Sequence, residues 1–188
     1  MADRNDSARK EAFLQKGLDL LADEGHRSIT IARLTKELEV TSGSFYWHFK
    51  SAADYQTALL VYWRGAVENV IDIARREGKG VTTTTLKALA EAVRKAGTYR
   101  YDDAMRRWAK ESEEVAEAIR DADRWRGRVL AEFIGVQDPT DERVELIGAT
   151  WRGTSGMSDE ERRFRLLALT TDTDELRTRR KTEPQKDP

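Results

Sequence analysis

Residues 40–50 of the chain read VTSGSFYWHFK, in which four aromatic residues and a histidine fill the five positions from Phe45 to Phe49. A strand with one buried face would alternate apolar and polar residues, and a helix buries only one stripe of its surface. Consecutive helical residues sweep most of a turn, so these side chains cannot all face a core. Phe45 and Phe49 stand four apart and can share the buried side. We therefore expect a short helix that exposes Tyr46 and Trp47.

The sequence on either side of this stretch predicts further helices. Apolar residues between positions 13 and 22 recur at helical spacing, and Gly25 stands where a glycine would end that helix. Thr30 can cap a short second helix, and after a turn of about three residues Thr41 or Ser42 can cap the aromatic one. Helix, short turn and second helix is the arrangement that presents one helix to the major groove of DNA.

The outer face of this third helix carries groups that suit DNA. Gly43 and its neighbouring serines permit close backbone approach, and their hydroxyls can bond bases or phosphates. Tyr46 can donate its O–H to a phosphate oxygen, Trp47 can lie against a sugar or a thymine methyl, and His48 can donate to phosphate at the helix end. The pattern therefore favours a DNA-reading surface over an ordinary core, although His48 could instead be a structural histidine whose hydrogen bonds are satisfied within the chain.

Residues 13–63 resemble the N-terminal domain of the TetR family of transcriptional regulators. The residues that carry the resemblance are Gly25, Thr30, Leu34, Val40, Gly43, Ser44, Phe45, Tyr46, His48 and Phe49. The resemblance implies that operator DNA is contacted by Thr30, Ser42, Ser44, Tyr46, Trp47 and His48. Our full set of candidate DNA-binding residues adds Thr41 and Gly43 at the start of the helix, and Arg33 and Lys50 as phosphate contacts.

Three positions depart from the usual pattern of that family. Glu39 replaces a turn glycine, so it must adopt a left-handed conformation at a cost of roughly 1 kcal/mol or distort the turn. Ala32 replaces a basic residue of the second helix, and Ala52 replaces a lysine that opens the fourth helix. We expect the phosphate contacts either to be weaker than is usual in that family or to shift to other basic residues, namely Arg9, Lys10, Arg33 and Lys50.

The chain predicts an all-α fold, because it holds three prolines among abundant helix-forming residues. We expect a three-helix DNA-binding domain with a helix-turn-helix at residues 1–54. A helical ligand-binding and dimerisation domain is expected at residues 55–171, followed by a charged tail at residues 172–188. An apolar group at positions 164–169 precedes that tail.

The second half of the chain predicts helices near residues 112–134 and 140–153. Their apolar faces could pair in a four-helix bundle across a homodimer. A small-molecule pocket needs apolar and aromatic walls, and the candidates are Tyr62, Trp63, Tyr99, Tyr101, Trp108 and Trp125. Each of these aromatic residues could equally be ordinary core.

Composition narrows the other possibilities. The chain of 188 residues has a net charge of −1 and no cysteine, so a nucleic-acid surface must be a local patch and thiolate chemistry is excluded. His26 and His48 are its only histidines, and no cofactor or metal motif is present, so we expect neither cofactor nor metal. The N-terminus lacks the apolar core of a signal peptide, and no run of about 18 apolar residues occurs. We expect a cytoplasmic protein.

These observations favour a homodimeric regulator that binds an inverted-repeat operator in double-stranded DNA, and that a small-molecule effector releases. Two alternatives remain open. One is a helical protein-interaction module that uses the exposed Tyr-Trp face, and the other is an enzyme that works with carboxylates alone. The salt dependence of binding distinguishes the protein-interaction module from a DNA-binding protein, because counterion release makes DNA affinity fall steeply as salt rises.

Overall fold

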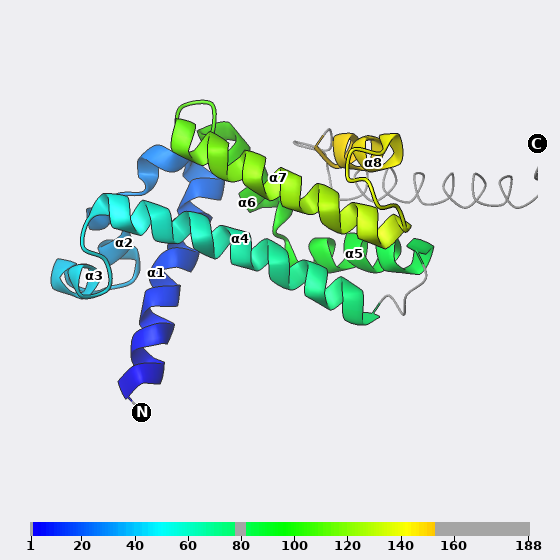
Figure 1. Ribbon diagram of the computed structural model, residues 1–188. Coiled ribbons are helices and arrows are strands. Elements are labelled where there is room, and N and C mark those ends of the chain that lie inside the picture. The colour runs from blue at the N-terminus through cyan, green and yellow to red at the C-terminus, as the bar shows by residue number, and fades with distance from the viewer. Residues whose placement is uncertain (1, 78–81, 153–188) are drawn as a thin grey trace, which may run out of the picture. The chain divides into compact units, whose positions relative to one another are not determined.

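The computed structural model describes residues 2–77 and 82–152, and within these ranges every element is a helix (Figure 1). The all-α fold predicted from the sequence is thereby confirmed. The elements are α1 (Ala2–Glu24), the 3-10 helix η1 (His26–Ser28), α2 (Ile31–Glu37), α3 (Ser42–His48), α4 (Ala52–Glu77), α5 (Thr82–Ala96), α6 (Tyr99–Trp108), α7 (Glu113–Ile134) and α8 (Glu142–Arg152). The apolar group at 164–169 and the charged tail at 172–188 lie outside the described residues. None of the described helices combines the length and apolar character that a membrane crossing requires.

The described residues form two compact units. The first unit comprises residues 2–68 and 98–122, and the second comprises residues 69–77, 82–97 and 123–152. Residues 98–122 join the first unit because α6 and the start of α7 bury apolar side chains in its core, among them Met105, Trp108 and Val115. The three-helix DNA-binding domain expected at residues 1–54 falls within this unit, and its bounds stay a prediction.

A buried hydrogen bond joins α1 and α4 within the first unit. The Tyr55 hydroxyl of α4 donates a hydrogen bond to the Phe13 carbonyl oxygen of α1 at 2.8 Å, and burial raises the pKa of this phenol. A Cβ atom on Gly17 would lie 1.9 Å from the Tyr55 hydroxyl oxygen. A side chain at residue 17 is thus excluded because the buried Tyr55 ring and hydroxyl occupy that space.

The second unit buries an apolar set from the end of α4, from α5, from α7 and from α8. Its members are Val70, Ile71, Ala74, Leu89, Ala92, Val129, Leu130, Ala131, Phe133, Val144 and Ile147. A Cβ atom on Gly127 would lie 4.0 Å from the Val144 side chain, so α7 and α8 pack closely at this point. Leu146 of α8 is exposed.

Candidate DNA-binding interface

The third helix turns one aromatic pair inward and another outward. Phe45 and Phe49 are fully buried, whereas Tyr46 is 56% exposed and Trp47 is 78% exposed. The Phe13 ring of α1 contacts both buried rings edge-on, with centroids 5.6 Å from Phe45 and 6.0 Å from Phe49. Since α3 has only seven residues, its orientation depends on this aromatic packing more than on its own backbone hydrogen bonds.

Two threonine caps and a closed turn set the geometry between α2 and α3. Thr30 accepts a hydrogen bond from the Arg33 amide at 3.1 Å, and Thr41 accepts one from the Ser44 amide at 3.4 Å. Between the caps, Glu39 has a φ of 54°, the only left-handed non-glycine residue in the described part of the chain. The turn glycine of the TetR pattern is thus replaced by a glutamate that adopts the glycine-like conformation.

The N-terminal end of α3 is open to solvent. Thr41, Ser42 and Gly43 are exposed and Ser44 is half-buried. The Thr41 oxygen accepts the Ser44 amide, so its O–H remains able to donate to a phosphate or a base. Thr30, at the start of α2, is also exposed while it caps that helix.

His48 does not lie on the outer face with Tyr46 and Trp47. Its side chain is 3% exposed, and its ring packs 6.0 Å from Phe13 and 6.1 Å from Phe49. Helical geometry accounts for this, because residue 48 lies only about 60° around the helix from residue 45. The imidazole is placed as a packing group beside the buried phenylalanines.

The basic candidates differ in how they are engaged. The Arg33 guanidinium lies 2.9 Å from a Glu24 carboxylate oxygen and 3.0 Å from one of Glu37. Lys50 is exposed at the end of α3, and its backbone N–H donates to Asp54 at 2.7 Å. Arg9 and Lys10 are exposed on α1, and the Lys10 ammonium sits 5.6 Å from the Phe49 ring centroid. Arg33 would have to leave its carboxylates to reach a phosphate, whereas Lys50 would not.

One residue near this face was missed by sequence reasoning. The Trp47 indole N–H donates a hydrogen bond to the Asp6 carboxylate at 3.0 Å. No local signal could have revealed the contact, because the two residues are 41 positions apart. An acidic side chain of α1 therefore adjoins the proposed reading face.

The aromatic candidates for a ligand pocket occupy several environments. Trp63 and Trp108 are buried in the first unit's core, and the Trp108 ring stacks on His26 with centroids 5.7 Å apart. Tyr99 is half-buried in the same unit, while Trp125 is half-buried in the second. Of these four residues, Trp63 and Trp108 belong to one apolar core, that of the first unit.

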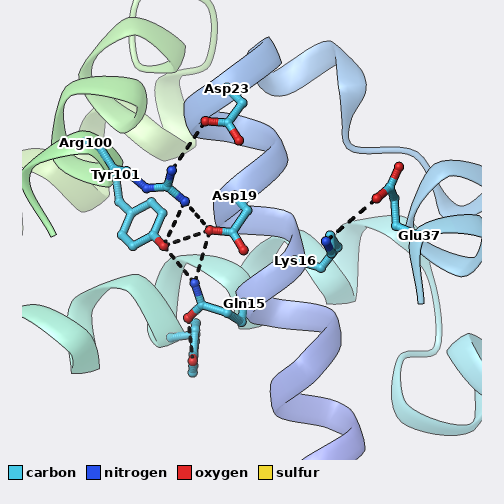
Figure 2. Close-up of polar contacts among 8 residues, drawn as sticks. Gln15, Lys16, Asp19, Asp23, Glu37, Arg100 and Tyr101 are labelled. Carbon is cyan, nitrogen blue, oxygen red and sulfur yellow. Dashed lines mark hydrogen bonds and ion pairs between the residues drawn. The ribbon is translucent and has the colours of Figure 1, made fainter. Parts of the chain in front are cut away.

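The remaining two candidates, Tyr62 and Tyr101, belong to a polar network between α1, α4 and α6. The Tyr62 hydroxyl donates to the Gln15 side-chain oxygen at 3.1 Å, and the Gln15 amide donates to the Tyr101 oxygen at 2.8 Å. Tyr101 in turn donates to Asp19 at 2.8 Å, and Arg100 bonds the same carboxylate (Figure 2). Burial raises the pKa of both phenols, so both hydroxyls stay protonated at neutral pH.

Comparison with known proteins supports the sequence resemblance. A family model described as "Bacterial regulatory proteins, tetR family" matches residues 13–54. The transcriptional regulator AcuR of Cereibacter sphaeroides is 28% identical over 72 residues, which are 38% of this chain and 33% of AcuR. The match thus spans about a third of the length of this curated relative.

Two solved structures share the fold over nearly the whole chain. A transcriptional regulator from Rhodococcus sp. Rha1 has a TM-score of 0.69 at 19% identity, covering 88% of this chain and 96% of its own. A transcriptional regulator from Aquifex aeolicus VF5, described as TerR/AcrR family, has a TM-score of 0.63 at 18% identity, covering 89% and 99%. At this identity the likeness concerns the fold.

Proposed function

We propose that this chain, whose residues 13–54 match the model of the TetR family of bacterial regulatory proteins, is a repressor of that family that a small molecule releases from an operator. The observation that carries the proposal is the outward pair of α3. Tyr46 and Trp47 are exposed on a helix whose other aromatic residues are fully buried. Large exposed aromatic side chains on the second helix of a helix-turn-helix are costly in water and useful against DNA.

The dimensions of α3 suit the major groove. Seven helical residues span about 10 Å, and the groove is about 12 Å wide. Its hydroxyl-bearing N-terminal end can approach base edges and phosphates, as recognition helices do. The proposed DNA contacts are the candidate residues between positions 30 and 50, with the His48 ring in a supporting position behind them.

We propose that the protein works as a homodimer on an inverted repeat. Two-fold protein symmetry is matched by two-fold operator symmetry, with half-sites one helical turn or more apart. The candidate dimer elements are the predicted helices near 112–134 and 140–153, where the structure has α7 and α8. Since operator DNA is the partner, we expect the protein in the cytoplasm and expect no catalytic activity.

The effector is proposed to bind through the aromatic residues of the expected regulatory domain at 55–171. Release from DNA requires that the effector binds more tightly to a conformation in which the spacing of the dimer's two DNA-binding domains does not match the operator half-sites. Such coupling typically amounts to about 1 to 3 kcal/mol. The candidate wall residues remain those named from the sequence, although Tyr62 and Tyr101 already use their hydroxyls within the chain.

Selection of bound duplexes from a random-sequence library tests the proposal directly. The full chain should enrich an inverted repeat, and its affinity for that repeat should fall steeply as salt rises. Trp47→Ala should weaken this enrichment, because the affinity for the repeat should fall by roughly 1 to 3 kcal/mol. Val61→Ala, which shortens another exposed apolar side chain on α4, should leave enrichment intact.

The same experiment addresses the interaction-module alternative. If the chain enriches no sequence, or if binding responds little to salt, DNA regulation is the wrong function. In that case the exposed Tyr-Trp face would have to serve a protein partner, whose aromatic contacts depend little on salt.

A further inference from the structure

Asp6 lies on a part of α1 that precedes the hydrophobic core. Among the residues whose burial the structure describes, Phe13 is the first that is buried, and residues 2–12 of α1 extend beyond it by about three turns. The N-terminal turns of α1 project past the helices around them in Figure 1. From this extension Asp6 places one carboxylate oxygen 3.0 Å from the Trp47 indole nitrogen and 3.6 Å from His48 Nδ1.

The Asp6 carboxylate lies beside two rings, of which His48 is fixed by packing and Trp47 is exposed. The His48 ring is held by its packing against phenylalanines, whereas Trp47 is 78% exposed. An indole that is so exposed has little packing to select one rotamer. Its N–H is the only hydrogen-bonding group of the side chain. The Asp6 oxygen accepts a hydrogen bond from this N–H and can therefore fix the direction in which the ring points.

We propose that Asp6 is a positioning residue of the DNA-reading face, which holds the Trp47 indole in its DNA-contacting orientation and so sets sequence discrimination. The inference rests on the proposed function. A side chain that is already ordered before binding loses less conformational entropy in the complex. This smaller entropy loss favours binding only in the specific complex, because only there does the indole contact DNA.

The negative charge of Asp6 has a separate effect. A carboxylate beside the reading face repels phosphates whatever the DNA sequence. It therefore lowers affinity for operator and for other DNA alike, and leaves their ratio unchanged. A change in the ratio of operator affinity to non-operator affinity consequently measures the effect of the hydrogen bond to Trp47. An equal change in both affinities measures the effect of the charge.

The test uses the full chain and two DNA probes. One is a duplex recovered from a random library with the parent protein, and the other is the same duplex with its base pairs shuffled. Dissociation constants for both are measured at one salt concentration for the parent, Asp6→Ala and Asp6→Asn. Asp72→Ala, which removes an exposed carboxylate from α4 outside the proposed reading face and dimer helices, is the charge control.

Asp6→Ala should lower the specific-to-shuffled affinity ratio about fivefold, the fold-change expected for ordering one side chain on binding. Asp6→Asn keeps an oxygen acceptor and should hold the ratio within about twofold of the parent. Asp72→Ala should leave the ratio as it is in the parent. Thermal midpoints of all variants should match, because the contact is exposed.

A double-variant cycle locates the effect at Trp47. Trp47→Phe keeps an aromatic ring but has no N–H, so Asp6→Ala should change the ratio little in that background. An unchanged ratio in Asp6→Ala alone, or an equal loss in both backgrounds, overturns the inference. If the parent itself binds both duplexes equally, it is the proposed function that fails.

Discussion

Replacement of Phe45 by alanine tests whether α3 is oriented as described. The Phe45 ring is fully buried and lies 5.6 Å from Phe13, 5.1 Å from Phe49 and 5.4 Å from Tyr55, measured between ring centroids. Removal of a buried phenylalanine side chain costs about 3 to 5 kcal/mol. Each aromatic pair adds about 0.5 to 1.5 kcal/mol beyond its buried area. We therefore expect a loss near the upper end of the range, about 4 to 5 kcal/mol.

A loss of this size is a large part of a domain's stability, which is about 5 to 15 kcal/mol. In a unit of this size each kcal/mol shifts the melting temperature by about 4 to 8 °C, so Phe45→Ala should lower it by at least about 15 °C. Urea and thermal unfolding of the full chain, followed by far-ultraviolet circular dichroism, measure both quantities. DNA binding should vanish together with the helical signal of the first unit.

Trp47→Ala is the matched control on the same helix. The indole is mostly exposed, so its loss should change the unfolding free energy by less than about 1 kcal/mol. Specific DNA affinity should nevertheless fall by roughly 1 to 3 kcal/mol. If Trp47→Ala unfolded the head while Phe45→Ala left it intact, the helix would be rotated and its proposed DNA face would be its core.

Four further outcomes are expected. Gly17→Ala should destabilise the chain by more than about 2 kcal/mol in urea unfolding, because the new Cβ would overlap the Tyr55 hydroxyl. Glu39→Gly should raise the unfolding free energy by up to about 1 kcal/mol, because glycine adopts the φ of 54° without strain; a loss on calorimetry would contradict this. Tyr46→Phe should weaken binding to operator and shuffled duplexes equally, as loss of a phosphate contact does; a changed ratio would indicate base contact. Sedimentation at micromolar concentration should give twice the chain mass of 21.5 kDa, and a monomer would exclude the proposed dimer.

The orientation of α3 was predictable because local spacing alone decides it. Positions 45 and 49 differ by about 40° around a helix, whereas position 47 lies about 160° from each. The spacing therefore predicts that Phe45 and Phe49 lie on the side of the helix opposite Trp47. The observed burial of the two phenylalanines and the exposure of Trp47 agree with this prediction. The same geometry places residue 48 near the buried side, and a strict application would have predicted its burial. Chemical suitability for phosphate led the sequence reasoning to favour an exposed histidine instead.

Contacts between distant segments were beyond the reach of the sequence. Asp6 meets Trp47 across 41 residues, and Arg100 meets Asp19 across 81 residues. Neither pair has a local periodicity, since each depends on how α1 packs against another helix. The placement of residues 98–122 in the first unit has the same origin. An amphipathic stripe shows that a helix is buried, but it does not identify the helix that buries it.

The tyrosine network limits how an effector could use Tyr62 and Tyr101. Gln15 bridges their hydroxyls, and Tyr101 also donates to Asp19. A ligand that bonded either hydroxyl would have to displace Gln15 or Asp19, both of which lie on α1, the helix that packs against α3 through Phe13. Burial raises the pKa of both phenols, so the neutral form favours folding and this contribution is complete below the unfolded pKa of about 10. It is lost only as pH rises through the higher folded value. Around neutral pH the network therefore does not titrate, and only a competing hydrogen-bonding group or a shift of α6 can open it.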